Sequence, residues 1–139
     1  MNRYLKILLI IWELPQTVLV AIIIFFSRRK ITGRGTYKNV DINYVKNFPG
    51  GISLGRFIIL NDKYSGHEFS IKHEYGHSNQ SLYLGWLYLL VVGLPSITRA
   101  ILWRTLKLDR SGYYRGYPEN WANKLGFSRE EYLKILEKL

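Results

Sequence analysis

Two histidines separated by three residues, His73 and His77, constrain this chain more than any other feature. A helix places residues four apart on the same face, so both imidazoles would point toward one position in space. Such a position can hold a zinc ion, for which imidazole nitrogen is a good ligand. Glu74 would lie about 100° further round the helix, where its carboxylate can reach a water bound to the ion. The spacing therefore predicts a helix from about residue 65 to beyond residue 80 that carries a metal site.

The other metal ligands must be carboxylates, because the 139-residue chain contains no cysteine. An ion held by two histidines needs a third protein ligand if one position is to stay open for water. We predict Glu119, near the start of a short helix at residues 118–126, as this ligand. Asn123 lies one turn later on the same face and can hydrogen-bond a zinc-bound histidine. His67 fits the histidine face poorly, and we interpret it as an exposed or helix-capping residue.

Two long apolar segments flank the polar middle of the chain. The first, residues 7–27, contains a single charge at Glu13 and exceeds the roughly 20 residues needed to cross a hydrocarbon core. A charge at membrane depth is costly, so we expect Glu13 to face protein, water or a functional cavity. The segment has no small-residue cleavage site and is followed by three basic residues. We interpret residues 1–30 as an N-terminal membrane helix or hairpin, and the sequence does not choose between the two.

The second apolar segment, residues 82–103, is an insertion within a single domain of residues 31–139. His77 precedes the insertion and Glu119 follows it, so a straight crossing would separate two ligands of one ion by about 30 Å of hydrocarbon. The insertion is therefore predicted to return to the side on which it begins. Pro95 would divide it into two arms, each too short to span a bilayer.

The formal charge of +10 comes from 20 Lys and Arg residues against 10 Asp and Glu residues. Basic residues crowd next to the two apolar segments, where anionic lipid headgroups would attract them. Aromatic residues lie mainly inside the apolar segments, unlike the interleaving of basic and aromatic residues in nucleic-acid binders. We expect membrane lipid as a partner and no nucleic acid, with the metal site on the cytoplasmic face. The oligomeric state does not follow from the sequence.

Residues 52–60 are predicted to form one β-strand, because they are β-rich and bounded by Gly-Gly before and Asn-Asp after. This strand either belongs to the core or offers an exposed edge to which an extended peptide can add. In the second case Leu54, Gly55, Arg56 and Phe57 would contact the peptide. Together with the helices, the strand gives a mainly α fold with a small β-sheet, of the α+β class.

The segment from His73 to His77, followed by Glu119 to Asn123, resembles the HExxH and ExxxD patterns of the gluzincin family of zinc metallopeptidases. Asn123 stands where the family has aspartate. An amide oxygen can still accept the imidazole proton, but it carries no charge and leaves the histidine less basic. The second half of the chain also resembles small bacterial membrane proteins of predicted metallopeptidase type. The resemblance implies a membrane-associated minimal zincin in the bacterial inner membrane.

The resemblance further implies hydrolysis of peptide bonds in a peptide or protein substrate. Zn²⁺ on His73, His77 and Glu119 would activate a water, and Glu74 would act as the general base. A hydrogen bond to the oxyanion would come from one of three tyrosines, Tyr113, Tyr114 or Tyr117. Aromatic residues near a membrane also serve as interfacial anchors, which is the other interpretation of these tyrosines. The alternative function is a non-hydrolytic zinc-binding membrane protein, a sensor or chaperone, that needs the ligands but not Glu74.

Overall fold

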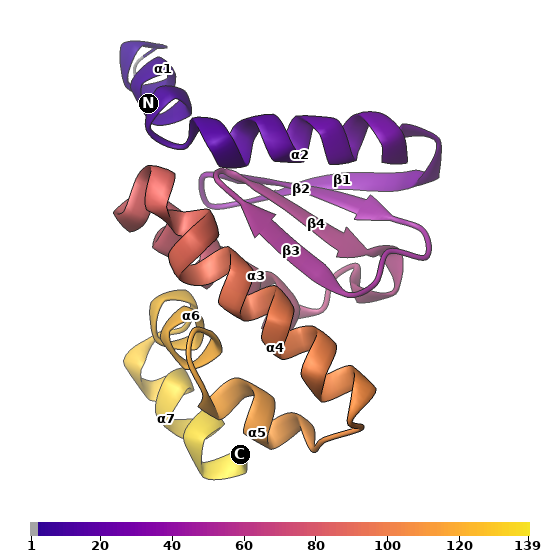
Figure 1. Cartoon of the computed structure of the whole chain (residues 1–139), viewed down its shortest axis with the longest axis vertical. Coiled ribbons are helices and arrows are strands. Elements are labelled where there is room, and N and C mark those ends of the chain that lie inside the picture. The colour runs from indigo at the N-terminus through magenta and orange to yellow at the C-terminus, as the bar shows by residue number, and fades with distance from the viewer. Residues whose placement is uncertain (1–2) are drawn as a thin grey trace.

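The computed structural model, which describes residues 3–139, contains seven α-helices and a four-stranded sheet (Figure 1). In chain order the elements are α1 (Arg3–Trp12), α2 (Leu14–Ser27), β1 (Ile31–Tyr37), β2 (Val40–Val45), β3 (Gly51–Leu54), β4 (Phe57–Asn61), α3 (Glu68–Leu84), the π-helical turn η4 (Leu89–Gly93), α4 (Leu94–Thr105), α5 (Arg110–Arg115), α6 (Glu119–Gly126) and α7 (Arg129–Lys138). The α+β class predicted from the sequence is confirmed.

The sheet has the strand order β1-β2-β4-β3, with β2 and β4 parallel and both outer strands antiparallel to their neighbours. The prediction of one strand over residues 52–60 was wrong. Gly55 has a φ of +61°, which reverses the chain and pairs β3 with β4 as a hairpin. The sheet edge next to α3 is therefore β3. Of the four residues predicted for a peptide-binding edge, only Leu54 lies on it, because Gly55 and Arg56 form the turn and Phe57 begins β4.

Both faces of the sheet are covered by helices. Alternate strand residues, including Ile58 and Leu60, pack against Ile71 and Tyr75 of α3. The intervening residues, including Ile59, face α2 on the opposite side. Figure 1 shows α2 lying along one side of the sheet, and α3, largely behind α4 in this view, packs on the other, so the sheet fixes the position of α3.

The N-terminal segment does not form one straight helix, because α1 and the segment Leu14–Lys30 are bent by 89° relative to each other. Among the described residues no single helix is both long and apolar enough to cross a membrane, although this bent pair could do so by length and composition. Glu13 lies at the bend, is buried, and accepts a 2.8 Å hydrogen bond from the Ser81 hydroxyl of α3. Of the three surroundings expected for Glu13, which were protein, water or a functional cavity, the structure shows protein.

The second apolar segment turns at Gly85 rather than at Pro95. Gly85 ends α3 with a φ of +51°, and η4 then leads into α4. Pro95 lies in the first turn of α4, directly after the π-helical turn η4, and the chain stays helical through it. The prediction that Pro95 divides the segment was therefore wrong. Figure 1 shows α4 leading from this turn back toward α5.

Two tryptophans connect the bend of the first segment to the turn of the second. The Trp12 indole donates to the Leu82 carbonyl and the Trp86 indole to the Ile11 carbonyl, each at 2.8 Å. Trp12 also packs so closely on Gly85 that a Cβ there would overlap the indole ring. The two apolar segments consequently form one structural unit.

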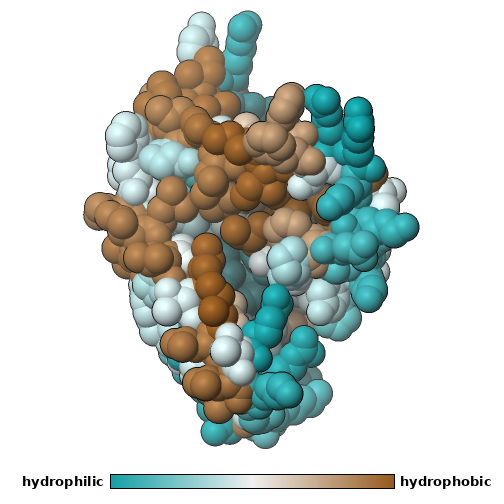
Figure 2. All heavy atoms as spheres, turned by 45° about the vertical axis from the view of Figure 1, so that its right-hand side comes forward, coloured by the Kyte–Doolittle hydropathy of each residue, from teal (hydrophilic) through white to brown (hydrophobic). Residues whose placement is uncertain are grey.

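Large apolar side chains are exposed along α1, α2 and α4. Figure 2 shows hydrophobic residues gathered over the upper and left parts of one face, with hydrophilic residues along its right and lower edges. Examples are Leu8, Phe26 and Leu94, which are 62%, 79% and 60% exposed. Exposed apolar patches of this kind mark surfaces that contact a membrane or another protein.

Glycine stands at both points where α6 approaches α3. A Cβ at Gly76 would collide with the carbonyl oxygen of Ala122, and a Cβ at Gly126 would collide with the carbonyl oxygen of Lys72. The helices are therefore in backbone contact, which larger residues would prevent. This contact brings Glu119, the first residue of α6, within reach of α3.

Replacing Gly76 by alanine should lower the free energy of unfolding by about 1 kcal/mol. Overpacking a helix contact costs about 1–3 kcal/mol, and the colliding atom belongs to the backbone, so the cost exceeds the gain of about 1 kcal/mol in helix propensity. Gly35→Ala is the control, since its Cβ would lie 3.7 Å from the Tyr44 ring, an ordinary contact. Urea denaturation of both variants measures the difference, and a Gly76→Ala protein as stable as wild type would contradict the prediction.

Candidate metal centre

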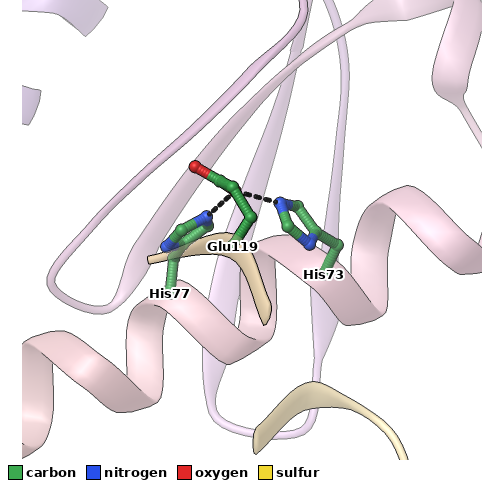
Figure 3. A group of neighbouring side chains, drawn as sticks. All are labelled: His73, His77 and Glu119. Carbon is green, nitrogen blue, oxygen red and sulfur yellow. Dashed lines mark hydrogen bonds and ion pairs between the residues drawn. The ribbon is translucent and has the colours of Figure 1, made fainter. Parts of the chain in front are cut away.

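His73, His77 and Glu119 converge on one point (Figure 3). The Nε2 atoms of both histidines lie 3.0 Å from the same carboxylate oxygen, Oε2 of Glu119. The candidate ligand atoms all lie within 4.8 Å of one another, and all three side chains are buried. The structure thus brings together the three residues predicted as metal ligands, two from the middle of α3 and one from the first turn of α6.

Each imidazole is oriented by an amide oxygen on its other nitrogen. Nδ1 of His73 lies 2.7 Å from Oδ1 of Asn123, as predicted, and Nδ1 of His77 lies 2.7 Å from Oε1 of Gln80. Gln80 is held in this orientation because its Nε2 donates a 3.0 Å hydrogen bond to the Pro118 carbonyl. Amide oxygens only accept hydrogen bonds, so both Nδ1 atoms carry a proton.

This tautomer leaves both Nε2 atoms with a lone pair directed at the Glu119 carboxylate. Two Nε2 atoms and one carboxylate oxygen, all electron-pair donors, then face one buried point. Because a neutral imidazole of this tautomer has no proton on Nε2, no proton lies between these three atoms. A cation at this point would satisfy all three donors. Two imidazole nitrogens and one carboxylate oxygen are a donor set that zinc accepts, so the residues fit such an ion.

Glu119 is fully buried, and its second oxygen, Oε1, accepts a 2.6 Å hydrogen bond from the Ser96 hydroxyl of α4. Burial opposes ionisation of this carboxyl, but when no cation lies between the three residues, protonated His77 and His73 outweigh burial and lower the pKa of Glu119 well below its usual range. The carboxylate is therefore charged, as a metal ligand must be.

Glu74 is the second buried carboxyl group of the centre. Burial raises the pKa of Glu74 to about 7, with His73 opposing the rise and Glu119 adding to it. Its Oε2 atom has no hydrogen-bond partner among the described residues. A Cβ at Gly51 would collide with its Oε1 atom, so the glycine of β3 leaves the space that this carboxyl occupies. A buried carboxyl without a partner is costly, which is typical of a group kept for chemistry.

Two pockets meet at the centre. Both are lined by His73, Glu74, Gly51, Ala100 and Tyr113. The apolar pocket, of about 300 Å³, lies between β3 and α4. The basic pocket, of about 560 Å³, extends toward the end of α4 and the start of α5. A molecule that reaches the centre can therefore extend in two directions from it.

The three candidate tyrosines have different surroundings. Tyr113 lines both pockets, and burial followed by the charge of Glu119 raises its pKa. Tyr114 packs edge-on against the His73 ring with centroids 5.2 Å apart. Tyr117 donates a 2.5 Å hydrogen bond to a backbone carbonyl of η4 and is 48% exposed. Of the three tyrosines, Tyr113 is the one that lines both the apolar and the basic pocket.

His67 is the N-cap residue of α3, and its Nδ1 atom accepts a 3.4 Å hydrogen bond from the Ser70 amide. The interpretation of His67 as a capping residue is confirmed. Two residues of the centre, Gln80 and Ser96, were not predicted. Gln80 follows His77 by three residues on one helix, so helical spacing could have identified it. Ser96 reaches Glu119 through the tertiary fold, and no local pattern marks it.

Comparisons with known proteins do not assign this chain to a family. No protein-family model, no curated protein and no solved structure matches it. The chemistry of the centre itself is therefore the basis for a functional proposal.

We expect the purified protein to bind one zinc ion per chain and to lose stoichiometric zinc in Glu119→Ala. Asn123→Ala keeps all three ligands but releases the His73 ring, so its zinc affinity should fall about 10- to 100-fold. His67→Ala is the control and should bind zinc like wild type. Elemental analysis and competition with a chromophoric chelator measure these values, and full zinc occupancy in Glu119→Ala would exclude Glu119 as a ligand.

Proposed function

We propose that this chain is a membrane-associated zinc metallopeptidase of gluzincin type that hydrolyses peptide bonds. The observation that carries the proposal is the convergence of two imidazoles and a charged carboxylate beside the unpaired carboxyl group of Glu74. Zinc held by His73, His77 and Glu119 would polarise the scissile carbonyl and lower the pKa of a water to about 7.

Glu74 has the position and environment of a general base. It would take a proton from the attacking water and pass that proton to the leaving amine. Its unpaired Oε2 atom is available for this proton, and Gly51 leaves the carboxyl group room beside β3. Tyr113, which lines both pockets, would donate a hydrogen bond to the oxyanion.

A peptide substrate would bind along β3. This strand is an edge of the sheet, and Gly51 to Leu54 line the apolar pocket beside Glu74. At Gly51 and Ile52, which are not buried, this edge can offer backbone N–H and C=O groups to an extended peptide. Toward Leu54 the edge is closed, because Ser53 and Leu54 are buried and the Ser53 carbonyl accepts a hydrogen bond from the Tyr88 hydroxyl. The peptide would then lie between β3 and α4, with its scissile bond at the centre.

A non-hydrolytic zinc protein, such as a membrane sensor or chaperone, would need the same ligands but no general base. The environment of Glu74 favours hydrolysis, because a buried carboxyl without a hydrogen-bond partner destabilises the fold. A purely structural zinc site has no use for such a group.

Replacing Glu74 by glutamine should leave zinc content unchanged and lower peptide hydrolysis by about 10²–10⁴-fold, because the amide cannot accept the water proton. Glu68→Gln, an exposed change in the same helix, is the matched control and should keep full activity. Turnover of a quenched-fluorescence peptide library reports the difference. Equal turnover by wild type and Glu74→Gln would exclude this mechanism.

Membrane association is supported by the exposed apolar side chains of α1, α2 and α4 and by the exposed basic residues 28–30 at the end of α2. The two tryptophan hydrogen bonds hold these apolar segments together on one unit. We propose the bacterial inner membrane as the location, with the metal centre on the cytoplasmic side where lysine and arginine are enriched.

Single cysteines at Lys63 and Lys124, introduced into this cysteine-free chain, should react with an impermeant maleimide from the same side of sealed vesicles. Both positions are exposed, and they precede and follow the second apolar segment. A cysteine at Leu90, which is 68% exposed within that segment, should react only after detergent is added. Labelling of Lys63→Cys and Lys124→Cys from opposite sides would contradict the proposed topology.

A further inference from the structure

The two pockets that meet at the metal centre have opposite chemical character. Leucine and isoleucine side chains dominate the apolar pocket, and they are Leu19, Ile52, Leu54, Leu89, Leu94 and Ile97. Three cations line the basic pocket, Arg104 and Lys107 near the end of α4 and Arg110 at the start of α5. Figure 2 shows a hollow near the middle of one face, bordered by hydrophobic residues on one side and hydrophilic residues on the other.

The cations of the basic pocket form no ion pair with a carboxylate within residues 3–139, although Asp109 directly precedes Arg110 in the chain. None of the four ion pairs found within residues 3–139 involves Arg104, Lys107 or Arg110. The one acidic residue among those lining this pocket is Glu74 of the centre itself. Three cations around one pocket attract an anionic ligand and repel a cationic one.

Strand β3 connects the two pockets. Gly51 lines both, Ile52 to Leu54 line the apolar pocket, and Pro49 and Gly50 line the basic pocket. A peptide paired with the edge of β3 advances about 3.3 Å per residue. A few residues on each side of the centre are therefore enough to place one part of the peptide in each pocket.

We propose that the substrate is an extended polypeptide segment with apolar residues on one side of the scissile bond and acidic residues on the other. This inference rests on the proposed peptidase function and names its substrate class. The apolar side chains would be buried between β3 and α4, where the hydrophobic effect favours them. The acidic side chains would pair with Arg104, Lys107 and Arg110, which also discriminate against lysine at the same positions.

The first experiment compares quenched-fluorescence peptides that carry a leucine-rich half and either an aspartate-rich or a lysine-rich half. Each pattern is made in both orders along the peptide, because a sheet edge accepts a strand in either direction. For at least one order, kcat/KM should be about tenfold higher for the acidic peptide than for its lysine counterpart, and this preference should shrink at high ionic strength. Replacing the leucines by serines should lower kcat/KM for the acidic peptide.

A charge reversal provides the sharper comparison. Arg104→Glu combined with Lys107→Glu should turn the preference toward the lysine peptide, a gain that a misfolded protein would not produce. Lys134→Glu combined with Lys138→Glu makes the same change of net charge on the exposed surface of α7 and should keep the preference for the acidic peptide. Equal hydrolysis of acidic and lysine peptides by wild type, in both orders, would overturn the inference.

Binding to the Glu74→Gln protein separates this inference from the proposed function. Fluorescence anisotropy should give about tenfold tighter binding of the acidic peptide than of the lysine peptide, with the order reversed by the Arg104→Glu and Lys107→Glu changes. This binding preference without hydrolysis by wild type would support the peptide site and reject the peptidase. Glu74-dependent hydrolysis without any charge preference would support the peptidase and reject the proposed substrate class. A charge reversal that weakens binding to anionic lipid vesicles but leaves both peptides unaffected would assign the cations to lipid and overturn the inference.

Discussion

The backbone contact between α3 and α6 is the constraint on which the metal centre depends. Gly76 directly precedes His77, and Gly126 ends the short helix that begins with Glu119, so the contact lies beside the candidate ligands. With α6 this close, the short side chains of Glu119 and Asn123 can reach the histidines of α3. A wider separation would demand longer side chains, whose extra rotamer entropy would weaken the orientation of the imidazoles.

The two buried carboxyl groups of the centre differ because their partners differ. Glu119 faces two histidines and a serine hydroxyl, and the pKa of its carboxyl is lowered despite complete burial. Glu74 lies one helical position from His73 but has an oxygen without a partner, and burial raises its pKa to about 7. Environments that push two pKa values apart suit one group to remain an anion and the other to exchange a proton. This difference supports separate roles as ligand and base.

The sequence predicted those parts of the centre that follow from local spacing. His73, Glu74 and His77 were found from helical periodicity, Glu119 and Asn123 from the same rule applied to a second helix, and their assembly in the fold agrees. The positions of the chain reversals were not predicted. Gly55 looked like a residue within a strand and Gly85 like one within a helix, because a positive φ leaves no pattern in the neighbouring residues. Ser96 and the contacts of Gly76 were missed for a related reason, since the atoms they meet are distant in sequence.

The apolar segments and the metal centre share structural elements rather than lying side by side as separate parts. Glu13 and Gln16 at the bend after α1 hydrogen-bond to Ser81 and Gly85, which end the helix that carries both histidines. Helix α4 leaves the same turn with Leu94 60% exposed, yet Leu94 also lines the apolar pocket. The mouth of that pocket therefore opens on the apolar surface. With this surface in the bilayer, as proposed, an apolar segment of a substrate could pass from lipid into the pocket without crossing water, so the hydrophobic effect would not oppose its entry.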